Sequence, residues 1–233
     1  MPVQGRPVLD YWLHSLRQLS VDGVLVNLHH HADEVREFLG QDHYREWVAS
    51  IYEPNLLGTG GTLFNNRDFF RQGVTLLAHA DNLCLCDLGA FLDFHCNKRP
   101  EDTVMTMMTF TADDPRQCGI AQLDDRGVVV DFFEKSPDSH GRLANAGVFL
   151  LEPKFFDGSY GIVGETVDFS RDIVPQLMGR IATWHNGQYL RDIGTPSSLM
   201  IVQEAPVPIL PEYDTIWSQN FRVHCIHDWL LKL

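Results

Sequence analysis

Two aspartates are the residues of this 233-residue chain whose types and positions point most directly to chemistry. Asp81 ends the apolar run VTLLAHAD (residues 74–81), and Asp192 ends a shorter run just before Gly194. We expect both carboxylates at the carboxyl edge of a sheet, where open α/β sheets bind ligands. Two carboxylates at one edge repel each other unless a cation lies between them, and hard, oxygen-preferring Mg²⁺ suits such a pair. Aspartates at strand ends are also common turn residues, so this pattern alone leaves a structural role open.

A glycine-rich segment, LLGTGGTL (56–63), precedes a predicted helix. Its glycines at 58, 60 and 61 would let a ligand approach backbone N–H groups at the positive end of that helix. The segment lacks the lysine of a P-loop and the spacing of the GxGxxG fingerprint. A simple glycine-rich turn is therefore the alternative.

Adjacent opposite charges occur in FFEKSP, where Glu134 is followed by Lys135. If both lie in a strand, their side chains point to opposite faces. In a binding site the carboxylate would hold sugar hydroxyls and the ammonium group would meet a phosphate. The alternative is a solvated strand edge.

The elements that must position these residues alternate between apolar runs and helical patterns. This alternation predicts an α/β fold, Rossmann-like, with a mixed, mostly parallel sheet flanked by helices. Residues 118–135 predict a hairpin that turns through Asp-Asp-Arg-Gly. Ser170 is a candidate N-cap for a helix over 168–179, with Asp168 and Asp172 at its start. The other expected strands are 21–28, 46–53, 74–81, 103–110, 143–153, 181–186 and 188–194, and the other expected helices are 32–40, 60–73, 87–97 and one from Pro196.

Composition excludes several classes of partner. The net charge of −13, with no basic stripe, argues against a nucleic-acid partner. No apolar run is long enough to span a bilayer and no secretory signal follows Met1, so no membrane is expected. The five cysteines are an odd number without a CxxC pair, which favours reduced thiols in a cytoplasmic protein.

We expect one domain over residues 1–204 and a C-terminal extension over 205–233. The extension contains FRVHCIH (221–227), which we expect as an additional strand beside residues 21–28. The sequence leaves the oligomeric state open, including a homo-oligomer.

The residues also raise two other functions. His29, His30 and His31 suggest a transition-metal hydrolase, but consecutive histidines cannot all face one ion from a regular element. A dinucleotide-dependent oxidoreductase is disfavoured because no GxGxxG follows a strand.

Seven segments in a fixed order resemble the sugar-1-phosphate nucleotidyltransferases. The resemblance is greatest to the mannose-1-phosphate and heptose-1-phosphate guanylyltransferases. The segments are PVQGRPVLDYWL, VNLHHHADEVREFL, EPNLLGTGGTL, AHADNL, FFEKSP, NAGVFLLEP and RDIGTP. Each segment is weak evidence singly, but the seven in sequence cover residues 2 to 199.

The resemblance implies transfer of a nucleotidyl group from an NTP, with GTP favoured, to a sugar 1-phosphate. It assigns the catalytic Mg²⁺ to Asp81 and Asp192, and a catalytic cation to Lys135. It places the nucleotide near Glu53, Gly58, Thr59, Gly60 and Gly61. It places the sugar phosphate near Gly119, Glu134, Lys135 and Asn145.

In this family a first strand, a GGxGTRL loop and a lysine precede the PVxGRP segment, and none of these appears before MPVQGRP here. We expect either that Met1 is an internal methionine of a longer, active protein, or that the chain is a non-catalytic nucleotide-binding, sugar-binding or regulatory relative. Retention of Asp81, Asp192, Glu134 and Lys135 favours the first. The DNA upstream of Met1 would distinguish the two.

Overall fold

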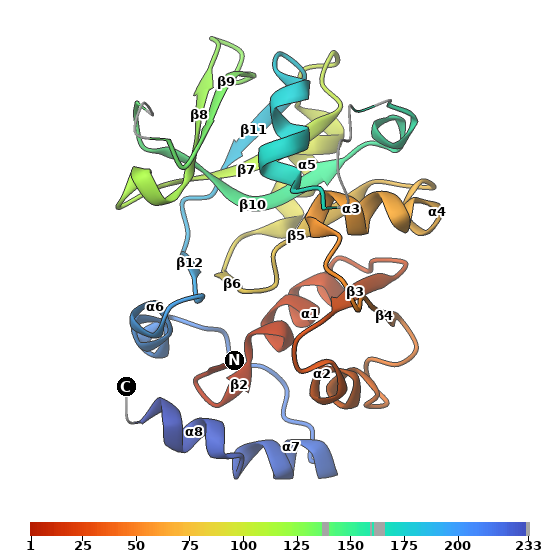
Figure 1. Cartoon of the computed structure of the whole chain (residues 1–233), viewed down its shortest axis with the longest axis vertical. Coiled ribbons are helices and arrows are strands. Elements are labelled where there is room, and N and C mark those ends of the chain that lie inside the picture. The colour runs from red at the N-terminus through yellow and green to blue at the C-terminus, as the bar shows by residue number, and fades with distance from the viewer. Residues whose placement is uncertain (137–139, 159, 161–165, 232–233) are drawn as a thin grey trace. The chain divides into compact units, whose positions relative to one another are not determined.

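The computed structural model describes residues 1–136, 140–158, 160 and 166–231. These residues form two compact units (Figure 1). The first unit comprises Met1–Leu56, Ala80–Leu85 and Tyr189–Leu233, and the second comprises Leu57–His79 and Cys86–Gln188. The expected boundary at residue 204 is not where the units divide, because residues 205–231 pack with the first unit.

The first unit contains three small strand pairs and several helices. Strands β3 and β4 are parallel, whereas the pairs β1–β2 and β6–β12 are antiparallel. Its elements are β1 (Pro2–Val3), β2 (Arg6–Pro7), α1 (Val8–Gln18), β3 (Val24–Leu28), α2 (Ala32–Leu39), β4 (Val48–Tyr52), β6 (Asn82–Cys84), β12 (Leu190–Asp192), α6 (Pro196–Ile201), α7 (Ile216–Arg222) and α8 (Cys225–Leu230).

The second unit is built on a six-stranded sheet in which β10 pairs with β5, β7 and β8. Its elements are α3 (Gly58–Asn65), α4 (Arg67–Phe70), β5 (Thr75–Ala78), α5 (Leu88–Asn97), β7 (Met105–Thr111), β8 (Gly119–Leu123), β9 (Val129–Glu134), β10 (Leu143–Leu151) and β11 (Ile181–His185). Short 3₁₀ and π turns cover Pro115–Gln117, Pro153–Asp157, Phe169–Ile173 and Val174–Leu177, and Val202–Glu204 in the first unit is also 3₁₀.

The predicted sheet type is confirmed by the strand directions. Strands β5, β7, β8 and β11 run one way, and β9 and β10 run the other. Neighbouring strands are nevertheless mostly antiparallel, because β10 lies between strands of the other direction and β9 pairs with β8. Consecutive residues of β7 and β10 are buried, as expected for a sheet covered on both faces.

The segment 168–179 differs from the helix expected there. A π turn, Phe169–Ile173, leads into a 3₁₀ turn, Val174–Leu177, because Pro175 cannot supply the N–H that a regular helix needs. The cap is Asp168, whose carboxylate accepts the N–H of Arg171 at 2.8 Å; Ser170 lies inside the turn. The expectation of Ser170 as N-cap was wrong, and that of Asp168 was confirmed.

The C-terminal extension is helical, so the expectation of a strand at 221–227 was wrong. Helix α7 begins with a capping box formed by Thr215 and Ser218, which favours a helix at this point. Trp217 and Phe221 are one turn apart and stack at 4.8 Å, and Trp217 also meets Phe38. A helix is needed to bring these two rings to one face.

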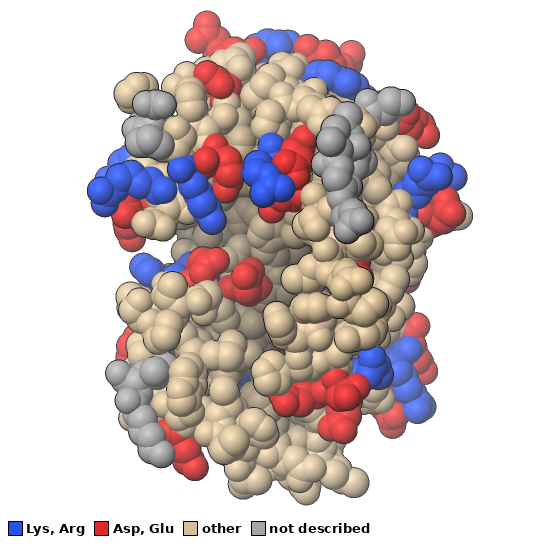
Figure 2. All heavy atoms as spheres, in the orientation of Figure 1, with Lys and Arg blue, Asp and Glu red and all other residues tan. Residues whose placement is uncertain are grey.

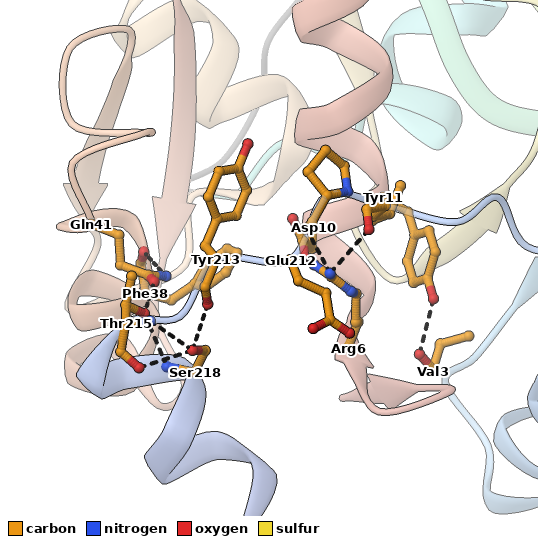
Figure 3. A network of polar contacts seen from close by, with 12 residues as sticks. Val3, Arg6, Asp10, Tyr11, Phe38, Gln41, Glu212, Tyr213, Thr215 and Ser218 are labelled. Atoms are coloured by element: carbon orange, nitrogen blue, oxygen red, sulfur yellow. Dashed lines mark hydrogen bonds and ion pairs between the residues drawn. The ribbon is translucent and has the colours of Figure 1, made fainter.

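Polar contacts hold the extension to the start of the chain (Figure 3). Arg6 pairs with Asp10 at 2.7 Å and donates to the carbonyls of Leu210 and Pro211 at 3.3 and 2.6 Å. Thr215 donates to Gln41 at 2.6 Å. The extension is therefore an integral part of the first unit.

Among the described residues, no helix is both long enough and apolar enough to cross a membrane.

Candidate functional site

Asp81 and Asp192 lie at neighbouring positions of the β6–β12 strand pair. Asp192 is in register with Asn82, and the N–H of Ile193 donates to the carbonyl of Asp81 at 3.0 Å. Both aspartates are exposed, whereas Asn82 and Ile193 are buried. The structure thus places the two aspartates that the sequence singled out at neighbouring backbone positions. One detail differs from expectation: β5 ends at Ala78, so Asp81 begins the turn into β6.

The backbone after Asp192 fixes one of its carboxylate oxygens. The N–H of Gly194 donates to Asp192 Oδ1 at 2.7 Å. A Cβ at position 194 would lie 2.9 Å from that oxygen, which is closer than real Cβ atoms come. Position 194 therefore has to be glycine for this carboxylate orientation to persist.

Two exposed carboxylates fit Mg²⁺ better than a softer metal. Within the described ranges, no group of three or more His, Cys, Asp or Glu side chains is placed to enclose an ion. Mg²⁺ is commonly held by one or two carboxylates, with water and substrate phosphates filling its other positions. The pair Asp81 and Asp192 has the donor chemistry for that arrangement.

Two of the three consecutive histidines have separate polar partners. His29 Nδ1 lies 2.7 Å from the carbonyl of Glu53, and His31 Nδ1 lies 3.1 Å from Glu34. His31 itself has φ 52° and directly precedes α2. The triad therefore acts as a strand-to-helix connection.

Glu53 directly follows β4 and is almost completely buried, at 4% exposure. Its N–H donates to Leu28 at 3.0 Å, and its carboxylate accepts the side-chain amide of Asn27 at 3.2 Å. Glu53 thus links the carboxyl ends of β3 and β4 by hydrogen bonds. A buried charged group of this kind needs such partners.

The glycine loop contacts its own chain, which corrects the interpretation of its N–H groups as facing a ligand. The N–H groups of Gly60 and Gly61 donate to the carbonyl of Val167 at 2.9 and 3.2 Å. Thr59 Oγ1 accepts the N–H of Phe169 at 2.9 Å. Gly58 has φ +77°, and a Cβ there would lie 2.7 Å from the carbonyl carbon of Val167. The glycines allow α3 to meet residues 167–169, a long-range contact with no local sequence signal.

Gly119 and Glu134 are directly opposed on β8 and β9. A Cβ at position 119 would overlap Glu134 Oε2 and lie 2.5 Å from Cζ of Phe132. The absence of a side chain at 119 therefore makes room for this carboxylate beside the sheet.

The environment of Glu134 disfavours its charge. Burial is the main cause that raises the pKa of Glu134, with Asp168 adding to the rise and Lys135 opposing it. Asp168 is thus electrostatically close to Glu134. Sequence reasoning treated Asp168 only as a helix cap, because nothing local relates positions 134 and 168.

Lys135 lies outside β9, so strand alternation does not set its direction, contrary to expectation. It is exposed, has φ +46° and donates its N–H to the carbonyl of Cys118 at 3.2 Å. A left-handed lysine costs of order 1 kcal/mol relative to an ordinary conformation. The turn therefore holds the start of this cationic side chain in one unusual orientation.

Asn145 lies beside Gly119 and Glu134 in the sheet. Ala144 pairs with Ile120, so Asn145 and Gly119 are the next positions along the two antiparallel strands. Its amide donates to Ser170 Oγ at 3.0 Å, and its Oδ1 accepts the N–H of Gly147 at 2.9 Å. Ser170 is a further neighbour that sequence reasoning missed.

The predicted residues therefore fall into two groups, one in each compact unit. The first unit holds Asp81, Asp192 and Glu53; the second holds the glycine loop, Gly119, Glu134, Lys135 and Asn145. The first group offers carboxylate oxygens to a hard cation, and the second offers a carboxylate, an amide and an ammonium group. On the face shown in Figure 2, basic and acidic side chains lie next to one another, without a continuous basic surface among the described residues.

The chain is similar in sequence to known nucleotidyltransferases. The family model described as "Nucleotidyl transferase" matches residues 1–206, ending two residues beyond the boundary expected from the sequence. The mannose-1-phosphate guanylyltransferase of Mycobacterium tuberculosis is 27% identical over 205 residues, which cover 86% of this chain and 56% of that protein. The UTP–glucose-1-phosphate uridylyltransferase of Synechocystis is 26% identical over 193 residues, covering 76% and 49%.

The chain thus spans about half the length of the curated relatives it matches. Among solved structures, HddC from Yersinia pseudotuberculosis complexed with GMP-PN superposes with a TM-score of 0.71 at 22% identity, covering 88% of this chain and 87% of that one. At this identity the likeness concerns the fold.

Proposed function

This chain belongs to the nucleotidyl transferase family, and we propose that it transfers a nucleotidyl group from an NTP to a sugar 1-phosphate in a Mg²⁺-dependent reaction. The observation that carries the proposal is the pairing of Asp81 and Asp192 through the 3.0 Å hydrogen bond of Ile193. Exposed carboxylates offer the hard oxygen donors that Mg²⁺ prefers, with water and substrate phosphates at its other positions. The neighbouring positions of the two aspartates therefore support a metal role.

In this proposal Asp81 and Asp192 hold the metal, which would neutralise charge on the phosphates when bound. Lys135 contributes an ammonium group that meets a substrate phosphate. The attacking group is a phosphate oxygen of the sugar 1-phosphate, which is already anionic, so no side chain has to act as a general base. Catalysis then consists of in-line positioning at the α-phosphorus and neutralisation of charge, with pyrophosphate as the leaving group.

The second unit supplies the proposed sugar-phosphate contacts. Glu134 accepts hydrogen bonds from sugar hydroxyls, and Asn145 contributes the amide hydrogen that Ser170 does not use. Gly119 keeps the space beside Glu134 open. The strand register supports these roles, because Gly119 on β8 lies between Glu134 on β9 and Asn145 on β10.

The proposed nucleotide is GTP. The support is the resemblance to guanylyltransferases, including the mannose-1-phosphate guanylyltransferase of M. tuberculosis. Relatives named for UTP and for adenylyl transfer also match, so the base has to be tested directly. Glu53 and the loop Gly58–Gly61 are the candidates for contacts with base and ribose, through atoms other than the N–H groups of Gly60 and Gly61, which donate to Val167.

A pyrophosphate-release assay tests the proposal. GTP with mannose 1-phosphate is compared with UTP and glucose 1-phosphate, each with Mg²⁺ and with EDTA. We expect turnover with GTP that EDTA abolishes, and a loss of about 100-fold or more in D81N and D192N. D22N is the matched control, because Asp22 is also exposed in the first unit but lies outside the β6–β12 pair.

Each outcome has a distinct meaning. Unchanged turnover in folded D192N would remove the metal assignment. Preference for UTP would correct the nucleotide. If calorimetry shows binding of mannose 1-phosphate but no nucleotide gives turnover, the enzyme proposal would be overturned in favour of a non-catalytic binding protein of this family.

A further inference from the structure

The β6–β12 strand pair that carries the two aspartates is small. Each strand has three residues, and within the described part of the chain the two strands pair only with each other. An isolated two-stranded ribbon is marginal in water. Something outside the ribbon must therefore fix the spacing of these carboxylates.

One side chain from a distant segment bonds to the ribbon. The indole N–H of Trp12, on α1, donates to the carbonyl of Asn82 at 2.8 Å. Trp12 is 5% exposed, and Asn82 is the residue between Asp81 and the rest of β6. This hydrogen bond spans 70 residues of sequence and ends one peptide unit from Asp81.

Apolar packing beside this bond comes from the same helix. Leu83 of β6 and Ile193, which follows Asp192, are buried in a cluster with Val8 and Tyr11 of α1. This packing is non-directional, so it holds the ribbon against α1 without setting its rotation or register. A hydrogen bond from a planar, buried donor is directional. Trp12 is therefore a contact that can orient the backbone at Asn82.

We propose that Trp12 is a positioning residue for the divalent cation: its indole N–H fixes the Asn82 peptide so that Asp81 and Asp192 are held at the spacing that the cation requires. The inference rests on the proposed metal role of these two carboxylates. It extends that role to a residue that touches neither metal nor substrate.

The test uses Mn²⁺ as a paramagnetic probe, titrated into the 233-residue chain and followed by the EPR signal of free Mn²⁺. W12F removes the indole N–H and keeps an aromatic ring. W47F is the matched control, since the Trp47 indole likewise donates to a backbone carbonyl, that of His43 at 2.9 Å, in the same unit but away from the ribbon. D192N reports loss of the proposed ligand.

We expect Mn²⁺ affinity to fall about tenfold or more in W12F, as for loss of a group that orients a metal ligand. W47F should bind like the wild type, and D192N should lose binding. Hydrogen exchange at the N–H of Ile193 should accelerate in W12F, because that N–H closes the ribbon at Asp81. If W12F does not fold, the isostere 3-benzothienylalanine at position 12 keeps the shape and removes only the N–H.

The outcomes separate the two proposals. Wild-type affinity in W12F, or in the benzothienyl variant, with binding lost in D192N, would overturn the role of Trp12 and leave the metal site standing. Equal weakening in W12F and W47F would show a general loss of stability and would also overturn it. Absence of Mn²⁺ binding by the wild type would overturn the metal assignment itself.

Discussion

The backbone of Gly119 lies directly against the carboxylate of Glu134, its partner across β8 and β9, so that a Cβ at position 119 would overlap Oε2. G119A should therefore displace the carboxylate or the strand. We expect it to weaken binding of mannose 1-phosphate, measured by calorimetry, and to cost about 1–3 kcal/mol of stability. G187A is the control, because no atom lies within 4 Å of a Cβ there. Equal binding by G119A and wild type would show that Glu134 does not contact the sugar.

The pH dependence of sugar-phosphate binding should depend on Glu134. Burial raises the pKa of Glu134, so its ionised form is lost at a higher pH than that of an ordinary glutamate. Affinity for mannose 1-phosphate should decline as the pH falls through that raised pKa, approaching tenfold per pH unit below it. E134Q should bind more weakly at pH 7 and lack this dependence.

The effect on stability has the opposite sign. A carboxyl group whose pKa is raised on folding stabilises the protein at low pH, and that contribution is lost as the pH rises through the folded pKa. E134Q should thus be at least as stable as the wild type at pH 7 in thermal unfolding. A less stable E134Q would argue that the charge is structurally required.

Lys135 allows function and backbone strain to be separated. Its φ of +46° suits glycine, so K135G should remove the ammonium group while matching or exceeding wild-type stability by up to about 1 kcal/mol. K135A removes the charge but retains the strain. Both should lose pyrophosphate release to a similar degree. A variant K135G that turns over normally would remove Lys135 from the mechanism.

Gly58 should be intolerant of any side chain. Gly58 and Gly179 both have φ +77°, but only a Cβ at 58 would meet another segment, the backbone of Val167. G58A should therefore destabilise the protein by at least about 1–3 kcal/mol more than G179A in urea unfolding. Similar losses in the two variants would mean that α3 and residues 167–169 can separate without cost.

Acid should destabilise the second unit partly through His95. This fully buried ring lies 2.8 Å from Thr106 and 3.2 Å from Glu152, whose carboxylate is already held by Arg99 at 2.6 Å. Burial, with Arg99, lowers the pKa of His95 to about 4. Between pH 6.5 and 4 the unfolded chain therefore binds a proton that the folded chain excludes, and stability falls in that window.

Urea unfolding at pH 7, 6 and 5 checks this. The unfolding equilibrium constant should rise toward roughly tenfold per pH unit over part of the range. H95Q should reduce that slope, whereas H140Q, at an exposed position, should not change it. The same slope in H95Q and wild type would place the acid sensitivity elsewhere.

The sequence predicted elements well where a local pattern sufficed. Continuous apolar runs located β7 and β10, and Asp-Asp-Arg-Gly located the β8–β9 turn, where Asp124 accepts the N–H groups of Arg126 and Val128. The tail was misjudged because FRVHCIH alternates like a strand. The deciding contact, Trp217 on Phe38, joins positions far apart in the chain.

Site prediction had the same limit. Asp81, Asp192, Glu134 and Lys135 stand out by type and position, but their surroundings come from long-range contacts. The carbonyl of Val167 accepts the N–H groups of Gly60 and Gly61, and Asp168 lies near Glu134. Both contacts depend on how distant segments pack, which no single segment of sequence shows. The same applies to Trp12, which is an ordinary apolar residue in the helical pattern of α1.

The discontinuous first unit has a consequence for synthesis on the ribosome. Strands β1 and β2 pair with each other, but Gln4 between them bonds to Gln203 at 2.9 Å and to Ala205 at 2.6 Å, and these contacts form only when those residues have been made. The second unit ends at Gln188 and is translated before them. At about 5–20 residues per second, synthesis from Leu56 to Gln203 takes about 7–30 s. During that time Val3, Val8 and Tyr11 lack the later members of their cluster, Leu199, Val202 and Ala205. Nascent chains stalled so that Gln188 has left the ribosomal exit tunnel but Gln203 has not should therefore protect the second unit from protease, while the amino-terminal segment is cleaved more readily.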